Sequence, residues 1–457
     1  MMKRVYIILF ATIIAALLPA FAFSQYLDYP QYLDISNNGG GARAAGMGNA
    51  YIGIADDEMA FSWNPAAMIF IDKSKLGLQF QSKADKFDMP WRTESNYLRT
   101  ITPTDTFPVV SLGDIRAKKN HFNLNFAGFA VPFTFFNRSW VVGGGYRNLY
   151  DMKFKFDGPG FLPGKTSTYS ESGGMDAVSV ALAGKIIEGF GIGITANDYI
   201  RHSEINFYEP KSIPLGEANG FDTVDVMSNY RSHYSGFNMD IGLTGEVNIF
   251  RAGLVLRTPY TLTDKYLRTI TYVIPEGSGG IIDRVTAATK IPFSFALGVS
   301  ARPIDKLILA LDYEKRPMSN SDITINYESN VPLFPSDTDK VINPNYQDLK
   351  EIRIGAEYFL SAGFADVPLR VGFDILPSVG TGYTQDSIGN ITPGIQIKTN
   401  IFSIGTGLHF KRAWLDLAYQ FGSSKNTSTI STPEGIKSDY KLKQDYSRLY
   451  ISGGMNF

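Results

Sequence analysis

The chain has 457 residues, with 43 basic and 44 acidic side chains, a formal net charge of -1 and no cysteine. The balanced charge argues against a nucleic-acid partner, because binding to phosphates requires an excess of lysine and arginine. The lack of cysteine excludes disulfides and thiolate metal sites, so stability has to come from a packed core or a closed sheet.

The N-terminal residues 1–24 are predicted to be a secretory signal peptide. Two basic residues precede an apolar run, and small residues follow it. Cleavage is expected after Ser24, with the position after Ala22 as the competing site. The alternative is an uncleaved anchor helix, which Pro19 disfavours. No later run approaches the roughly 20 apolar residues that a helical membrane span needs.

Residues 25–75 form a segment rich in small residues that lacks the alternation seen later in the chain. Gly41, Gly46 and Gly48 lie in it among alanines, and such residues allow backbones to pack closely. Gly46 and Gly48 also begin a GxG pattern, but Tyr51 occupies the third glycine position and no βαβ unit follows. We expect no nucleotide here, and no cofactor elsewhere.

Residues 76–457 alternate between apolar and polar or small side chains, which predicts strands with two different faces. In 415–421, for example, the odd positions are apolar or aromatic and the even positions are Asp416, Ala418 and Gln420. The chain ends on such a strand, with Phe457 as its last residue. This ending is typical of bacterial outer-membrane barrels, which face lipid outside and water or a ligand inside.

The connections between the predicted strands alternate between short turns and long polar stretches, and residues 82–120 and 209–232 are among the stretches expected to be loops. This predicts an all-β, antiparallel transmembrane barrel of about 14 strands, with short periplasmic turns, long outer loops and both barrel ends in the periplasm. Residues 251–271 and 306–327 are expected to be strands that extend above the membrane. Aromatic residues near strand ends fit either an interfacial girdle or ordinary strand propensity. A soluble β-sandwich or propeller is the alternative fold.

The run from Gly41 to Met68 (GARAAGMGNAYIGIADDEMAFSWNPAAM) resembles the N-terminal hatch of the FadL family, outer-membrane transporters of long-chain fatty acids and aromatic hydrocarbons. Later segments are similar to that family as well, among them RIGAEY at 353–358, PLRVG at 368–372 and LDLAY at 415–419. The resemblance extends over nearly the whole mature chain.

The resemblance implies a 14-stranded barrel whose lumen is blocked by a small N-terminal hatch, or plug. It also implies capture of a hydrophobic small molecule outside the cell and its passive release sideways into the membrane, so the expected partners are that ligand and outer-membrane lipid. Asn64, Pro65 and Ala66 match the family's hatch motif. Asn can cap a turn, Pro fixes φ and Ala permits close approach, although an ordinary Asx-Pro turn would have the same sequence.

Charged residues of the hatch segment are candidates for anchoring the plug to charges that face the lumen. Ions are costly in lipid, so such groups are expected on the water side in pairs, unless they are only loosely solvated there. The candidates are Arg43, Asp56, Asp57, Arg353, Glu357, Arg370 and Asp374. Ligand-contacting residues cannot be identified from the sequence.

Two other functions remain open at this stage. The tryptophan before the Asn-Pro-Ala triplet also resembles PorV-like proteins, accessories or shuttles of type IX protein secretion, whose partners would be secretion-system proteins. A general porin is the third possibility. Catalysis is not expected, because adjacency of His202 to Ser203 or of His233 to Ser232 does not make a triad. A metal site is not expected either, since no pair of histidines has ligand spacing.

Overall fold

The computed structural model describes residues 39–92, 111–159, 166–214, 221–274, 277–328, 339–386, 390–431 and 437–457. The predicted signal peptide and residues 25–38 lie outside these ranges. No helix in the described part of the chain is long and apolar enough to cross a membrane.

The described strands form one closed antiparallel barrel. In chain order they are β1 (Lys75–Arg92), β2 (Ser111–Phe135), β3 (Arg138–Asp151), β4 (Phe154–Pro159), β5 (Thr166–Ile187), β6 (Phe190–Ile200), β7 (His202–Pro214), β8 (Phe221–Val247), β9 (Phe250–Arg257), β10 (Tyr260–Ile274), β11 (Gly277–Ile291), β12 (Ser294–Ile304), β13 (Leu307–Arg316), β14 (Ile323–Tyr327), β15 (Lys340–Ile342), β16 (Leu349–Ser361), β17 (Asp366–Gln385), β18 (Ile391–His409), β19 (Ala413–Ser431) and β20 (Lys437–Asn456). Six consecutive pairs, β3/β4, β6/β7, β9/β10, β11/β12, β13/β14 and β15/β16, are each one strand with a break, so the 20 elements make the 14 strands that the sequence predicts.

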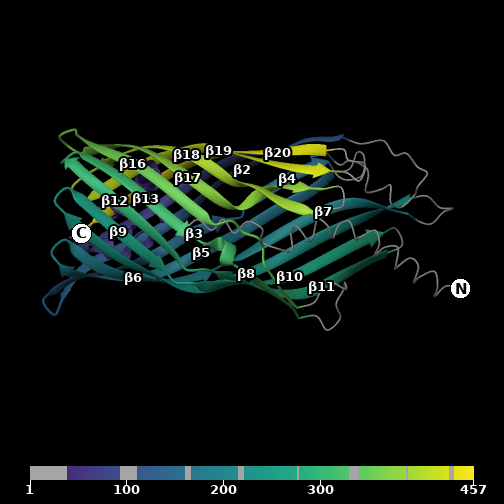
Figure 1. The fold of residues 1–457 in the computed structure, drawn as a ribbon, viewed down its shortest axis with the longest axis horizontal. Coiled ribbons are helices and arrows are strands. Elements are labelled where there is room, and N and C mark those ends of the chain that lie inside the picture. Colours follow the sequence, from purple (N-terminus) through teal and green to yellow (C-terminus); the bar gives the residue numbers. More distant parts are fainter. Residues whose placement is uncertain are drawn as a thin grey trace.

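The barrel closes because β1 pairs with β2 on one side and with β20 on the other. Lys75 at the start of β1 lies opposite Asn456 at the end of β20, so both ends of the barrel wall lie at the same end of the cylinder. The short turns lie at this end too, including the one at Asn248, which has a φ of 54°. Figure 1 shows the C-terminus at the end with the short turns.

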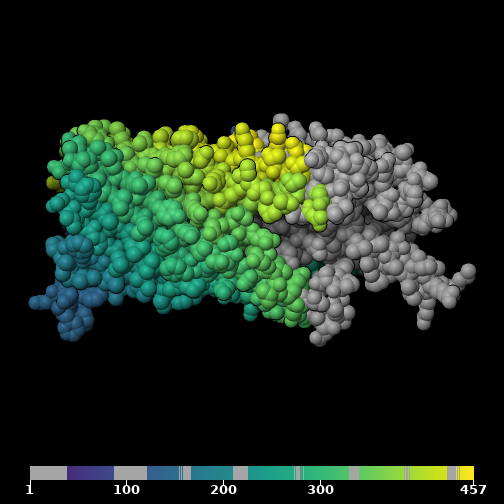
Figure 2. Space-filling view, in the orientation of Figure 1, coloured from purple at the N-terminus to yellow at the C-terminus, as the bar shows by residue number. Residues whose placement is uncertain are grey.

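The two faces of the wall differ as the alternation predicts. Leu415, Leu417 and Phe421 are 45%, 40% and 43% exposed, whereas Asp416 and Gln420 on the same strand are 2% and 0% exposed. Charges therefore point into the barrel, and a band of apolar side chains covers its outside. An outer wall of this kind contradicts the soluble sandwich or propeller, whose apolar face would be a buried core. In the space-filling view, the teal, green and yellow parts of the chain adjoin in one continuous outer surface (Figure 2).

The strands are longer than the sequence indicates. Residues 82–120 had the composition of a long polar loop, yet β1 continues to Arg92 and β2 begins at Ser111. The same holds for residues 209–232, which contain the end of β7 and the start of β8. The interpretation of these stretches as loops was wrong, because strand segments beyond the apolar band can carry polar side chains on their outward face.

The strands expected over 251–271 and 306–327 are present but broken. β9 ends at Arg257 before Pro259, and β13 is separated from β14 by a short 3-10 helix, η4 (Met318–Asn320), which follows Pro317. Proline has no N–H for the strand ladder, so it interrupts regular pairing. Pro292 lies in a similar break between β11 and β12. These breaks divide the barrel into the sheet that ends in the short turns and a second sheet on the opposite, loop side. The second sheet is formed by β4, β5, β7, β8, β10, β11, β14 and β15.

Candidate functional site: the hatch and the lumen above it

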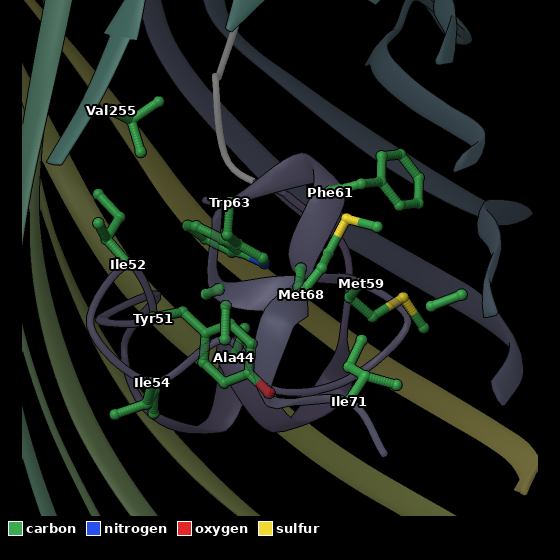
Figure 3. Packing of buried hydrophobic residues seen from close by; sticks show 14 of the residues in the cluster. Ala44, Tyr51, Ile52, Ile54, Met59, Phe61, Trp63, Met68, Ile71 and Val255 are labelled. Atoms are coloured by element: carbon green, nitrogen blue, oxygen red, sulfur yellow. The ribbon is translucent and has the colours of Figure 1, made fainter. Parts of the chain in front are cut away.

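A compact segment before β1, residues 39–71, lies inside the barrel and is here called the hatch. It contains α2 (Ala42–Gly46) and two 3-10 helices, η1 (Ala60–Ser62) and η2 (Pro65–Phe70). Its core is formed by buried apolar side chains, among them Tyr51, Met59, Trp63 and Met68, whose packing is seen in Figure 3. The hatch core continues into the wall through inward residues such as Val255 on β9.

Asn64 forms hydrogen bonds both within the hatch and to the barrel wall. Its side-chain oxygen accepts a hydrogen bond from the backbone N–H of Ala66 (3.1 Å) and so caps η2, whose first residue is Pro65. Its side-chain nitrogen donates to the carbonyl of Leu243 on β8 (3.1 Å). Asn64 is fully buried, so both polar atoms of its amide are satisfied inside the barrel.

Glycines bring the backbones of hatch and wall close together. Gly48 of the hatch has a φ of +62°, and a Cβ there would collide with the backbone of β17 at Phe373. On the wall, a Cβ on Gly298 would lie 2.6 Å from the backbone nitrogen of Gly53. Gly46 approaches Gly405 of β18, whereas a Cβ at Gly41 would make only ordinary van der Waals contacts, and glycine is favoured there by its φ of +112°. Inward wall glycines that face the hatch in this way are Gly193, Gly242, Gly253, Gly298, Gly355, Gly372 and Gly405.

Carboxylates of the wall also hold the hatch backbone. One oxygen of Asp312 on β13 accepts hydrogen bonds from the N–H groups of Tyr51 (2.6 Å) and Ile52 (2.9 Å). Asp374 on β17 accepts a hydrogen bond from the side chain of Asn49 (3.1 Å). Asp312 was not identified from the sequence, because its role depends on which hatch residues lie opposite it.

Four of the predicted charges form one network between hatch and wall. Arg43 pairs with Asp56 of the hatch (2.6 Å) and with Glu357 of β16 (2.7 Å). Glu357 also pairs with Arg370 of β17 (2.7 Å), which in turn pairs with Asp416 of β19 (2.6 Å). Burial would raise the pKa of Asp56, but Arg43, Arg251 and Lys75 outweigh it and hold that pKa well below its usual range.

The remaining predicted charges have other partners. Asp57 accepts a hydrogen bond from the hydroxyl of Tyr51 (2.5 Å), within the hatch. Arg353 pairs with Glu314 (2.9 Å) and Glu351 (2.8 Å), which are both wall residues. It also makes a cation–π contact with the hatch, with its guanidinium carbon 5.8 Å from the centre of a Trp63 ring. The ion pairs of Arg353 with Glu314 and Glu351 therefore lie within the wall.

Glu58 of the hatch is buried without a hydrogen-bond partner among the described residues. It is 1% exposed, and both of its carboxylate oxygens are unsatisfied. A Cβ added at Gly77 of β1 would meet this side chain, so glycine leaves room for it. Burial, followed by the charge of nearby Asp57, raises the pKa of Glu58 to about 8. Glu58 is thus uncharged in the hatch near neutral pH.

On the loop side of the hatch, the inward faces of the second sheet and the adjoining end of β6 carry tyrosines and aliphatic side chains. Tyr230 and Tyr266 pack with ring centres 6.4 Å apart, and Tyr199 and Tyr260 with centres 4.9 Å apart. Neighbouring members are Met175, Tyr234, Leu262, Val285, Ala287, Ile323 and Ile325. We call this set the loop-side aromatic cluster. The alternation over residues 262–270 could have predicted part of this cluster from the sequence, since Leu262, Tyr266 and Ile270 share one face of the strand.

The wall has a seam between β2 and the β3/β4 strand. The pairing of β2 with β3 ends on the loop side at Phe126 and Arg147. Beyond this point no strand ladder joins β2 to β4 in the described part of the barrel, and the side chain of Asn123 donates to that of Asn148 (3.3 Å) across the seam.

The histidine and serine neighbours noted in the sequence lie on opposite faces. His202 and His233 are exposed on the outside, with ring centres 6.1 Å apart, whereas Ser203 and Ser232 are buried. Ser232 donates instead to Asp264 (3.1 Å). The described residues contain no group of three or more histidine, aspartate or glutamate side chains placed to hold a metal ion.

The fold is similar to that of a solved FadL homologue and of solved toluene transporters. A FadL homologue from Pseudomonas aeruginosa matches with a TM-score of 0.63 at 13% identity, covering 92% of this chain and 98% of that one. The toluene transporter TodX from P. putida matches with a TM-score of 0.58 at 14% identity, covering 92% and 99%. The toluene transporter TbuX from Ralstonia pickettii gives 0.53 at 14% identity, covering 92% and 99%.

This chain has the closed 14-stranded barrel that the resemblance implied, and at such low identity its likeness to these structures concerns the fold. They give no support to the secretion-accessory alternative. No protein-family model and no curated protein sequence matches the chain.

Proposed function

We propose, from the fold shared with these transporters, that the chain is an outer-membrane channel for hydrophobic small molecules. A molecule enters from the loop side, is held by the loop-side aromatic cluster above the hatch, and leaves sideways through the wall. Long-chain fatty acids and aromatic hydrocarbons both belong to this class. A general porin is less well supported, because the hatch packs closely against the wall and obstructs a water-filled path.

The observation that carries this proposal is the apolar and aromatic lining of the lumen on the loop side. Tyr230 and Tyr266 are 7% and 8% exposed, and Ile323 and Ile325 beside them are 0% and 1% exposed. The lumen of a general porin is polar and hydrated. Ligand sites for small apolar molecules are instead lined by aromatic and aliphatic side chains with a few polar groups.

The seam between β2 and the β3/β4 strand supports lateral release. Along most of the wall, ladder hydrogen bonds close the space between neighbouring strands. At the seam only side chains such as Asn123 and Asn148 lie between the lumen and the outside. An apolar molecule that leaves here enters lipid without crossing water, which is its favoured direction of transfer.

The apolar outer band and the closed wall on the side of the short turns support a position in the outer membrane, since closed barrels leave no unpaired sheet edge in lipid. We propose that the short turns face the periplasm and the long connections face outwards. Both ends of the barrel wall are then periplasmic, because the start of β1 pairs with the end of β20.

Ligand titration of the detergent-solubilised protein tests this proposal. A fluorescent fatty acid and a fluorescent aromatic hydrocarbon are the probes, compared in wild type and in Tyr230→Ser/Tyr266→Ser. The double variant should bind at least one probe about tenfold or more weakly, because burying an aromatic ring contributes roughly 1.5–3 kcal/mol. Leu267→Ser is the matched control, since Leu267 follows Tyr266 on β10 and belongs to the opposite face. Equal affinity in wild type and double variant for both probes would overturn the proposal.

A further inference from the structure

Three lysines lie on the outside of the barrel at the loop-side edge of the apolar band. Lys315 of β13 lies directly opposite Lys350 of β16. On the next strand Pro377 takes the corresponding position, and it lies opposite Lys398 of β18. Lys350 and Lys398 are exposed and Lys315 is half-buried. We call these residues the lysine triad.

The surroundings of the lysine triad mark it as a border between lipid and water. Phe295 lies opposite Lys315, and its ring centre is 6.3 Å from that of Tyr313, the preceding outward residue of β13. On β16 the outward residues after Lys350 are Ile352 and Ile354, which are 41% and 50% exposed. Aromatic rings concentrate where membrane lipid meets water, so the lysines lie at the level of lipid headgroups.

The lysine triad has no acidic partner in the part of the chain that the structure describes. Like charges directly opposite one another on neighbouring strands are destabilising. Within the described residues, no ion pair joins Lys315, Lys350 or Lys398 to a carboxylate. Another cross-strand lysine pair, Lys425 opposite Lys443, differs in this respect, because Lys443 pairs with Asp445 (2.9 Å).

We propose that the lysine triad binds the phosphate of an anionic membrane-lipid headgroup. The phosphate neutralises the opposed ammonium groups of Lys315 and Lys350, and Lys398 approaches it from across Pro377. The acyl chains of the lipid then lie along the apolar band formed by residues such as Ile352 and Ile354. The inference rests on the membrane location proposed above and is independent of the compound that the channel carries.

Lysine is suited to this position for two physical reasons. Its long aliphatic stem can lie along apolar surface while its ammonium group stays in water. Each lysine near an anionic membrane surface also contributes about 1 kcal/mol to attraction, which corresponds to roughly a fivefold change in affinity.

Native mass spectrometry of the full chain in detergent, titrated with phosphatidylglycerol or zwitterionic phosphatidylcholine, tests the proposal. Wild type should retain phosphatidylglycerol preferentially. The variant Lys315→Gln/Lys350→Gln/Lys398→Gln should lose that preference, with an affinity lower by roughly fivefold for each lysine. The control Lys185→Gln/Lys306→Gln/Lys411→Gln changes the same charge near the short turns and should bind as wild type does.

Three results would overturn the proposal. They are unchanged phosphatidylglycerol binding in the first variant, an equal loss in the control variant, and displacement of the lipid by inorganic phosphate at equimolar concentration. The gel mobility of unheated samples checks that every variant is a folded barrel. Failure of the fluorescent-ligand titration would leave this result unaffected, so the two proposals fail separately.

Discussion

Arg43 of the hatch and Glu357 of the wall form an ion pair of 2.7 Å in which the Glu357 side chain is fully buried. The nitrogen Nε of Arg43 also donates to the other carboxylate oxygen of Glu357 (3.0 Å), so the contact is bidentate. A contact of this geometry fixes both the position and the orientation of α2 against β16.

Removing the charge of Glu357 should loosen the hatch without unfolding the barrel. Glu357→Gln leaves Arg43 and Arg370 buried without their shared carboxylate, and breaking a buried pair in this way costs roughly 3–5 kcal/mol. Hydrogen exchange should show faster exchange of amides in 39–71 and unchanged exchange in the strands. Asp445→Asn is the matched control, because its pair with Lys443 is 40–46% exposed and contributes little. Unchanged hatch protection in Glu357→Gln would show that this pair does not anchor the hatch.

A methyl group on the wall should displace the hatch. In Gly298→Ala the new Cβ would lie 2.6 Å from the backbone nitrogen of Gly53, and a backbone atom cannot move away as a flexible side chain can. Over-packing typically costs about 1–3 kcal/mol, so we expect faster proteolysis of the hatch in the folded barrel. Gly453→Ala, whose nearest neighbours would be 3.3 and 3.6 Å away, should be much milder. Equal protease sensitivity of the two variants would contradict the close backbone contact.

The stability of the hatch should fall as pH rises through the neutral range. Burial and the neighbouring Asp57 raise the pKa of Glu58 from 4.5 to about 8, with Lys75 and Asp416 as further charges near it. The folded hatch therefore keeps a proton that the unfolded segment loses above about pH 4.5. The contribution of Glu58 is most favourable below pH 4.5 and is lost between there and about pH 8.

Hatch protection in wild type, followed by hydrogen exchange from pH 5 to 8.5, measures this dependence after correction for the intrinsic exchange rate. Each unit of pKa displacement corresponds to about 1.4 kcal/mol. Glu58→Gln removes the titrating group at nearly constant shape and should flatten the profile. A profile as steep in Glu58→Gln as in wild type would assign the pH dependence to another group.

Closing the seam should stop lateral release. The side chains of Asn123 and Asn148 touch across it, and the chain has no native cysteine, so Asn123→Cys/Asn148→Cys can form one defined disulfide. Oxidation should lower uptake of a hydrophobic compound by cells, and a reducing agent should restore it. A disulfide between Thr263→Cys and Ala288→Cys, which are opposite on an intact ladder, should leave uptake unchanged. Full uptake with the seam disulfide formed would place the exit elsewhere.

The barrel was predictable because lipid outside and a polar lumen inside impose a period of two on every strand. Leu415, Asp416 and Leu417 have the expected exposure for this reason. The limits of the strands were not predictable, since β1 and β8 continue past the apolar band where the outward face also becomes polar. The breaks at Pro259 and Pro317 had a sequence signal in the prolines themselves.

The hatch was recognisable from its glycines and the Asn64 motif, but the wall residues that it contacts were not. Gly298 and Asp312 matter because they face Gly53 and Tyr51, and such pairings depend on how the closed barrel is filled. Arg353 shows the reverse case. It has the charge and the inward direction of an anchor, but its ion-pair partners are two wall carboxylates, Glu351 on its own strand and Glu314 on the neighbouring β13.

Uptake of a radiolabelled fatty acid and of an aromatic hydrocarbon by cells that express the protein tests the central claim most directly, with ion conductance in planar bilayers measured in parallel. The account predicts accelerated uptake of at least one of these compounds and very low steady conductance. Steady, porin-like conductance without accelerated uptake of either compound would contradict it.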